Sequence, residues 1–237
     1  MGHRTVRLLT ASAVTRDQFR PSGVKASRRR VEKAAGSQLK RILDITGASL
    51  AIIALSPLLI CVALMVWVTS PGPVFYGHQR IGQGGRPFKC WKFRSMILDS
   101  ERALARHLAN SPTARQEWHE TRKLRDDPRI TSIGQTLRAT SLDELPQLFN
   151  VLLGDMSLVG PRPVVKDELA LYGRSARYYL RARPGITGLW QVSGRSETAY
   201  SRRVALDRAY VKNAGFLMDL SILLRTVPVV LKARGSW

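Results

Sequence analysis

The hydrophobic pattern of the chain is dominated by one uncharged apolar run, which extends from Ile45 to Val68. As a helix rising about 1.5 Å per residue, this run is long enough to cross a hydrocarbon layer of about 30 Å. Ser56 and Pro57 stand at its centre. A proline inside a helix removes one backbone hydrogen bond and clashes with the preceding turn, and a neighbouring serine can satisfy the freed carbonyl. We therefore expect a membrane helix with a sharp bend at Ser56 and Pro57.

The basic residues on both sides of the run bear on its topology. Residues 1–41 carry 11 Lys and Arg against 2 Asp and Glu, and the remaining residues carry 27 against 15. Because basic flanks tend to stay on the cytoplasmic side, both ends of the segment are favoured on the same face of the membrane. This predicts a re-entrant membrane hairpin over residues 39–70 that enters and leaves on the cytoplasmic face. An ordinary kinked transmembrane helix is the alternative.

The segment before the apolar run is basic and has no apolar periodicity. Arg28, Arg29 and Arg30 form a cluster within it. We expect residues 1–38 to be a flexible basic arm that binds anionic lipid head groups, where each basic residue contributes about 1 kcal/mol near the surface. A specific nucleic-acid-binding tail is the alternative.

The pattern after the apolar run predicts one catalytic domain over residues 71–237. Short alternating segments around two Gly-rich turns, in "GPVFYGHQRIGQGGRPFKCWKF", indicate a β-hairpin. A helix is expected over Leu98–Leu124, interrupted around Ser111 and Pro112, and a later one is expected to end at Gly154.

The last part of the chain is expected to be helical from about Thr198. Its apolar residues recur through Phe216–Leu231, which is typical of a helix that lies on a bilayer and buries one face at the head-group boundary. A plain core helix is the alternative there.

Charge and cysteine content narrow the class of protein. The formal net charge of +21 implies an anionic partner, which could be a nucleic acid, an acidic lipid surface or a phosphorylated substrate. Cys61 and Cys90 have no spacing typical of a metal site, and a reduced, intracellular setting fits them. The sequence also lacks a GxSxG elbow, a Walker loop and a GxGxxG fingerprint, which weakens the usual hydrolase, NTPase and dinucleotide interpretations.

An acid pair interrupts this basic chain in "SLDELPQLFN", residues 141–150. One interpretation is a capping box, with Ser141 as the N-cap and Glu144 reaching back. Pro146 weakens it, because proline would then fall where a backbone donor is needed. A helix that begins at Asp143 puts Pro146 in the first turn, where no donor is needed. We therefore favour a helix that begins at the acid pair.

The acid pair and its basic surroundings suggest phosphate chemistry. The positive end of a helix and nearby arginines favour ionised carboxylates, and one or two carboxylates completed by water and substrate phosphate are typical of Mg²⁺. Lys92, Arg138 and Arg162 lie in neighbouring segments rich in turns. Arginine binds phosphate through two donors and lysine as a point charge. Asp143 and Glu144 are therefore candidate site residues, with these three cations as phosphate ligands.

The segments together resemble the bacterial sugar transferases, the monotopic polyprenyl-phosphate phosphoglycosyl transferases. The resemblance covers nearly everything from Lys40 onward and is carried by four blocks: "KRILDITGASLAIIALSPLLI", "GPVFYGHQRIGQGGRPFKCWKFRSM", "DDPRITSIGQTLRATSLDELPQLFNVLLGDMSLVGPRPVV" and "RPGITGLWQVSGR". The end of the chain is most similar to short members that initiate exopolysaccharide synthesis by transferring galactose 1-phosphate or glucose 1-phosphate. Overall similarity favours galactose 1-phosphate.

The resemblance implies a reaction and roles for the acid pair. A sugar 1-phosphate passes from a UDP-sugar to undecaprenyl phosphate and UMP is released, as the first step of exopolysaccharide biosynthesis. Asp143 is implied to be the nucleophile that forms a covalent phosphosugar intermediate, while Glu144 helps to hold Mg²⁺. Lys92, Arg138 and Arg162 match the family's phosphate-binding cations.

The resemblance also implies a fold and a location. It implies a mostly helical α/β fold that is not of the Rossmann type, in which interfacial amphipathic helices pack on the re-entrant hairpin broken at Ser56 and Pro57. The protein is then expected at the bacterial inner membrane with its catalytic domain on the cytoplasmic face. No nucleic-acid partner is expected, and a homodimer is left open. A non-catalytic membrane scaffold and a nucleic-acid-binding protein are the competing functions.

Overall fold

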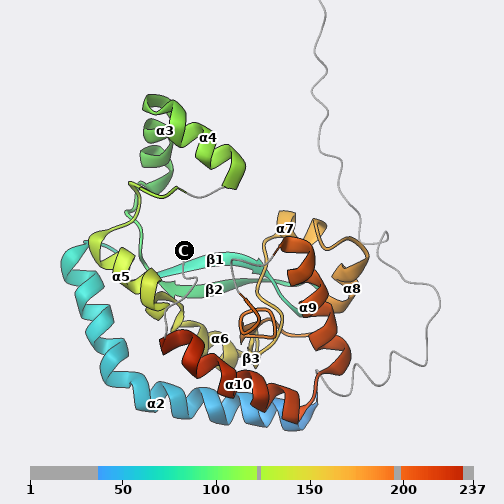
Figure 1. The fold of residues 1–237 in the computed structure, drawn as a ribbon. Coiled ribbons are helices and arrows are strands. Elements are labelled where there is room, and N and C mark those ends of the chain that lie inside the picture. Colours follow the sequence, from blue (N-terminus) through green and yellow to red (C-terminus); the bar gives the residue numbers. More distant parts are fainter. Residues whose placement is uncertain (1–36, 122–123, 195–198, 232–237) are drawn as a thin grey trace, which may run out of the picture.

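The computed structural model of the chain describes residues 37–121, 124–194 and 199–231. Of the basic arm predicted for residues 1–38, residues 1–36 lie outside the described residues. The described residues are mostly helical and include two small sheets of two strands each (Figure 1). This arrangement agrees with the predicted mostly helical fold and differs from the single parallel sheet of a Rossmann domain.

The apolar run forms one long helix, α2, over Gln38–Thr69. Figure 1 shows that α2 bends midway along its length. Pro57 lies inside the helix, and its missing N–H leaves the Ile53 carbonyl without the usual partner. The hydroxyl of Ser56 donates a hydrogen bond to that carbonyl at 2.8 Å. The predicted bend and the predicted role of the serine are both confirmed.

Within the described residues, α2 is the helix long and apolar enough to cross a membrane. Only 11% of its most apolar window is buried in the protein, so it differs from the core helix of a soluble domain. Its large exposed apolar side chains include Ile42, Leu50, Ile53, Ile60 and Trp67. The helix could therefore lie in a membrane, as its composition predicted.

Polar contacts fasten the first half of α2 to the rest of the protein. The guanidinium of Arg41 donates to the carbonyls of Val151 and Leu152, at 2.6 and 2.8 Å. The buried carboxylate of Asp44 accepts from the Ser157 hydroxyl at 2.9 Å and from the backbone N–H of the following residue at 3.0 Å. These contacts join the start of the apolar helix to segments more than 100 residues away.

The predicted β-hairpin is present. Strand β1, Phe75–Ile81, pairs antiparallel with β2, Pro87–Phe93, and a 3₁₀ turn, η2, joins them at Gln83–Gly85. His78 lies opposite Cys90 in this register. Because side chains alternate along a strand, one face of the hairpin carries the following set: Tyr76, His78, Arg80, Phe88, Cys90 and Lys92.

The expected interruption of the next helix is also found. Helix α3 covers Ser100–Asn110 and helix α4 covers Pro112–Thr121, and the two meet at Ser111. The Ser111 hydroxyl accepts from the backbone N–H of Ala114 at 3.2 Å, as an N-cap does. In Figure 1 this pair of helices projects from the body of the protein.

The predicted start of the helix at the acid pair is wrong. Helix α5, Ser132–Thr140, ends at Ser141, which has a left-handed backbone with φ of 59°. A 3₁₀ turn, η3, then covers Leu142–Glu144, and helix α6 begins only at Gln147. The capping box is wrong too, because the Ser141 side chain makes no capping hydrogen bond.

The physical reason for the later helix start is the tight turn that precedes it. The N–H of Leu145 bonds to the carbonyl of Leu142, three residues back, so the acids lie in a 3₁₀ turn. Pro146, which has no N–H, becomes the N-cap of α6. Helix α6 covers Gln147–Leu153 and ends at Gly154 with φ of 93°, which confirms the predicted stop.

The remaining elements include a parallel pair of strands, β3 and β4. These elements are β3 (Ser157–Val159), α7 (Lys166–Ala170), η4 (Gly173–Ser175), α8 (Ala176–Tyr179), β4 (Gly185–Thr187), α9 (Tyr200–Asn213) and α10 (Phe216–Leu231). Beside the pairing of β3 with β4, a Cβ on Gly185 would meet the backbone nitrogen of Gly160 at 2.0 Å. The two segments can therefore approach only because both residues are glycines.

Helix α10 has both buried and exposed apolar residues. Ile222 is buried, whereas Leu217, Leu224 and others on the helix are largely exposed. Asp219 joins the first turn of α10 to Lys40 of α2 through an ion pair of 2.7 Å. The interfacial position predicted for α10 stays a prediction.

Asn150 of α6 holds the hairpin in place. Its side chain is fully buried; Oδ1 accepts from the Trp91 N–H at 2.9 Å, and Nδ2 donates to the Lys89 carbonyl at 2.8 Å. Nδ2 also lies 3.3 Å from the carboxylate of Asp155. One side chain therefore fixes strand β2 against the helix that follows the acid pair.

We predict that Asn150→Ala lowers the free energy of unfolding by about 2 to 4 kcal/mol, because it leaves buried backbone groups of β2 unpaired. Thermal unfolding of the purified protein in detergent measures this change. Asn110→Ala, at an exposed helix end, is the matched control and should change stability little. An equal, small effect of both substitutions would contradict the anchoring role.

Candidate active site

The acid pair lies in the η3 turn and faces the hairpin. Asp143 is 6% exposed. The ammonium of Lys92, on β2, lies 3.2 Å from Asp143 Oδ2 and 2.7 Å from Glu144 Oε1. One lysine therefore contacts both carboxylates.

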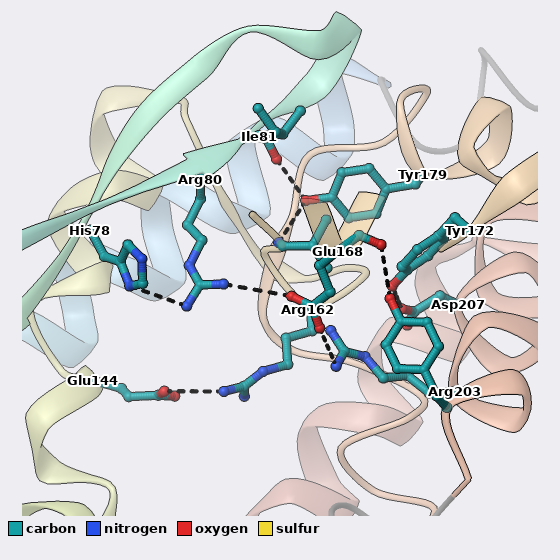
Figure 2. A network of polar contacts seen from close by, with 12 residues as sticks. His78, Arg80, Ile81, Glu144, Arg162, Glu168, Tyr172, Tyr179, Arg203 and Asp207 are labelled. Atoms are coloured by element: carbon teal, nitrogen blue, oxygen red, sulfur yellow. Dashed lines mark hydrogen bonds and ion pairs between the residues drawn. The ribbon is translucent and has the colours of Figure 1, made fainter. Parts of the chain in front are cut away.

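The two predicted arginines lie at opposite ends of the acid pair. Arg138, on α5, donates from Nε to the Ser95 hydroxyl at 2.9 Å, and its charge acts on Asp143. Arg162 Nη2 lies 3.8 Å from Glu144 Oε1 (Figure 2). The structure thus brings together all five residues that the sequence suggested for the site.

The bend of α2 is linked to this site through packing. Beyond Pro57, Leu59 and Val62 of α2 belong to an apolar cluster, and Leu142 and Leu145, on both sides of the acid pair, pack against it. The segment after the bend thus supports the turn that carries the carboxylates.

The two acids differ in their electrostatic surroundings. Burial would raise the pKa of Glu144, but Lys92 and Arg162 outweigh it and hold that pKa at about 2. Burial raises the pKa of Asp143 above its ordinary value, as does the charge of Glu144, and Lys92 and Arg138 only partly oppose this. Asp143 is therefore the more basic carboxylate of the pair.

Sequence reasoning missed His78 and Arg80. Both lie on the hairpin face that carries Lys92, and Arg80 Nη2 donates to His78 Nδ1 at 3.3 Å. Burial, together with Arg80 and Lys92, lowers the pKa of His78, which fits a neutral ring that accepts this hydrogen bond. The alternation of side chains within "YGHQRI" and "KCWKF" was the available signal. Using it to place His78 and Arg80 on the face of Lys92 required the register of the two strands.

A second polar network adjoins His78 and Arg80, and sequence reasoning missed it as well (Figure 2). Glu168 of α7 accepts from Arg203 of α9 at 2.8 Å and lies 3.7 Å from Arg80. Asp207, one turn after Arg203, accepts from the Tyr172 hydroxyl at 2.7 Å. Burial raises the pKa of Asp207 to about 6.

Trp190 connects the two polar groups. The guanidinium of Arg162 lies 5.6 Å from the centre of its ring, and that of Arg203 lies 4.7 Å from it. Such cation–π contacts orient an arginine without occupying a carboxylate. The indole thus positions Arg162 beside Glu144.

Comparison with known proteins identifies the family. The model that describes the bacterial sugar transferases matches residues 35–233. The chain belongs to the bacterial sugar transferase family. The predicted resemblance is confirmed, and the chain is an enzyme, a phosphoglycosyl transferase. The alternatives of a non-catalytic scaffold and of a nucleic-acid-binding protein are set aside.

Several curated proteins are similar to this sugar transferase. The exopolysaccharide production protein ExoY of Sinorhizobium fredii is 52% identical over 202 residues, 85% of this chain and 89% of that protein. The undecaprenyl-phosphate galactose phosphotransferase of Salmonella typhimurium is 52% identical over 205 residues, 86% of this chain and 43% of that protein. The UDP-glucose:undecaprenyl-phosphate glucose-1-phosphate transferase of Escherichia coli is 39% identical over 198 residues, 80% of this chain and 39% of that protein.

The donor set of this sugar transferase suits a hard cation better than a soft one. Within the described residues no group of three or more His, Cys, Asp or Glu is close enough to enclose a metal ion. Asp143 and Glu144 offer carboxylate oxygens only, and burial raises the pKa of the nearby Cys90 to about 11, which disfavours a thiolate ligand. One or two carboxylates completed by water and substrate oxygens are the usual ligands of Mg²⁺. The acid pair therefore fits that ion.

We predict that Lys92→Met moves the acid limb of the activity profile to higher pH. The substitution removes the cation that favours the ionised acids, so Asp143 and Glu144 protonate at higher pH and activity is lost sooner as pH falls. The maximal rate should also fall about 10- to 100-fold, because a charge-assisted hydrogen bond is lost.

The measurement is the initial rate over a range of pH. Lys89→Met changes an exposed residue on the opposite face of the same strand; it is the matched control and should keep the wild-type profile. An acid limb that stays in place in Lys92→Met would mean that Lys92 does not control the ionisation of the acids.

Proposed function

We propose that this sugar transferase moves a sugar 1-phosphate from a UDP-sugar to undecaprenyl phosphate and releases UMP. The observation that carries the proposal is a buried, relatively basic carboxylate, Asp143, held next to Glu144 by one lysine and flanked by arginines. Such a site can present an anionic nucleophile to an anionic substrate. Galactose 1-phosphate is the favoured group and glucose 1-phosphate the second, since the galactose phosphotransferase is the more similar of those two relatives.

The proposed reaction has two displacements. A carboxylate oxygen of Asp143 attacks the phosphorus that bears the sugar, the bond from that phosphorus to the UMP oxygen breaks, and UMP leaves with the electron pair. A phosphate oxygen of undecaprenyl phosphate then attacks the same phosphorus and releases the Asp143 carboxylate. Dividing the transfer in this way lets one residue serve both steps.

The cations of the site would compensate the charge that moves in these steps. Lys92 favours the ionised form of both carboxylates, and Arg138 lies at the Asp143 end, where the attacked phosphate would be bound. Arg162 lies at the Glu144 end. This division gives each phosphate of the substrate a nearby cation.

We also propose that Glu144 holds Mg²⁺. With a pKa of about 2, Glu144 stays ionised and can serve as a metal ligand over the whole physiological range. When bound, the ion would neutralise charge on the diphosphate of the substrate. Lys92 would then share Glu144 with the ion and remain in contact with Asp143.

The proposed location is the cytoplasmic face of the bacterial inner membrane, where the reaction would begin exopolysaccharide synthesis. Helix α2 would enter and leave on that face as a re-entrant hairpin bent at Pro57, and α10 would lie at the interface. The exposed apolar residues of both helices support this arrangement. Anionic lipids would bind the basic arm.

We predict that Asp143→Asn abolishes turnover while the protein still folds, since the change removes charge at almost constant volume. The purified protein is incubated with a panel of UDP-sugars and undecaprenyl phosphate, and UMP release is measured. A sugar labelled in its phosphate should remain attached to the wild-type protein when the acceptor is omitted.

Asp126→Asn, on the exposed surface, is the control for this substitution and should react like the wild type. Substantial UMP release by pure Asp143→Asn protein would exclude Asp143 as the nucleophile. Release of UMP by neither the variant nor the wild type, with every sugar of the panel, would count against the proposed reaction.

We predict that the N-terminal arm and the catalytic domain share the cytoplasmic side. A cysteine placed at residue 12, in a background lacking Cys61 and Cys90, should resist a membrane-impermeant thiol reagent in intact cells. The paired substitution of Ser56→Ala and Pro57→Leu should restore the interrupted helix and allow the segment to span, which exposes that cysteine. Labelling of the arm in the protein with an unaltered bend would replace the hairpin with a single-pass anchor.

A further inference from the structure

Arg80 is an accessible cation that the proposed steps leave without a role. It lies on the hairpin face that carries Lys92, and its side chain is 19% exposed. Its hydrogen bond to His78 uses one N–H, and its nearest carboxylate, Glu168, is 3.7 Å away. That distance is beyond a normal hydrogen bond, so most of the donors of Arg80 are available to a ligand.

Arg162 also has hydrogen-bond donors available to a ligand. Its side chain is 37% exposed, and its contact with Glu144 is 3.8 Å long. By contrast, Lys92 contacts Glu144 at 2.7 Å and Arg203 contacts Glu168 at 2.8 Å. The two carboxylates thus bind other cations closely, and both partly exposed guanidiniums keep donors for an anion.

The two arginines serve the same end of the acid pair. Figure 2 shows Arg80 extending from the hairpin strand and Arg162 extending toward Glu144. Burial and the charge of Arg162 lower the pKa of Arg80, so the two like charges lie close enough to repel. Both also act on Glu144, whereas the cations that act on Asp143 are Lys92 and Arg138. A phosphate between Arg80 and Arg162 would relieve this repulsion.

We propose that Arg80 and Arg162 form one phosphate-binding subsite that is used twice in each catalytic cycle. It first holds the phosphate of the departing UMP and then the phosphate of the incoming undecaprenyl phosphate. The reason is the in-line geometry of both displacements: the group that leaves and the group that enters each lie opposite Asp143 across the same phosphorus. The inference rests on the proposed function, and it adds Arg80 to the substrate-binding residues.

The test separates the two displacements with full-length protein. Loading of labelled phosphosugar from the UDP-sugar, in the absence of acceptor, reports the first. Discharge of the loaded protein by undecaprenyl phosphate, after removal of UMP, reports the second. We expect Arg80→Gln to slow both about 10- to 100-fold, and Arg80→Lys, which keeps the charge, to recover part of each.

Two further measurements distinguish ligand binding from a structural role. UMP can return the bound phosphosugar to UDP-sugar, so discharge by the acceptor is followed as lipid-linked product. UMP should compete with undecaprenyl phosphate in the formation of that product, and Arg80→Gln should weaken this inhibition, while its melting temperature stays near that of the wild type. Arg86→Gln, exposed in the same hairpin, is the matched control and should match the wild type throughout.

The possible outcomes decide the proposal. Loss of only one displacement would overturn the shared subsite, as would inhibition by UMP that does not compete with the acceptor or is unchanged in Arg80→Gln. If Arg80→Gln melts early, Arg80→Lys at wild-type melting temperature decides, and wild-type inhibition by UMP in that variant would overturn the proposal. A wild-type protein that cannot be loaded at all would instead refute the proposed function.

Discussion

The contact of one lysine with two adjacent carboxylates is the interaction on which the site depends. Two neighbouring acids in a poorly hydrated turn repel each other, and the Lys92 ammonium within 3.2 Å of both offsets that repulsion. Removing one member of such a cluster leaves an uncompensated charge. The position of Lys92 depends on strand β2, which Asn150 fastens to the helix after the acids. The site therefore requires both the hairpin, which carries Lys92, and the turn, which carries the two acids.

The same contact contributes to a difference in pKa between the two neighbouring acids. Glu144 is influenced by Lys92 and by Arg162, and its pKa stays at about 2. Asp143 is more deeply buried and its pKa is raised despite Lys92. In the proposed reaction, this difference assigns the more nucleophilic carboxylate and the permanently charged one to different tasks. Neither assignment follows from the order of the two residues in the chain.

Features with local causes were predictable from the sequence. The bend at Pro57, the hairpin and the interruption at Ser111 each follow from residues within a few positions. The helix start at Asp143 was mispredicted because Ser141 takes a left-handed backbone conformation, which is uncommon for residues other than glycine. No local pattern indicated the 3₁₀ turn that follows.

The second polar network could not be predicted, because its cause is tertiary. Arg203 and Asp207, four residues apart on a helix, have the spacing of an ordinary solvated pair. They are buried because α9 packs near Trp190 and Tyr172, which come from distant segments. Arg80 was missed for a related reason, since its place on the same face as Lys92 depends on the register of the hairpin.

The attachment of α2 to the rest of the protein links the depth of this helix in the membrane to the position of the active site. Arg41 and Asp44 tie the first half of the helix to α6 and β3, so this half and the catalytic residues move as one body. In the proposed membrane arrangement, the level at which α2 settles among the lipids then sets the height of Asp143 above the hydrocarbon. A carrier lipid has its phosphate at a nearly constant level in the head-group layer. Asp143 would thus lie at the level of the acceptor phosphate, and the lipid would not need to leave the bilayer to react.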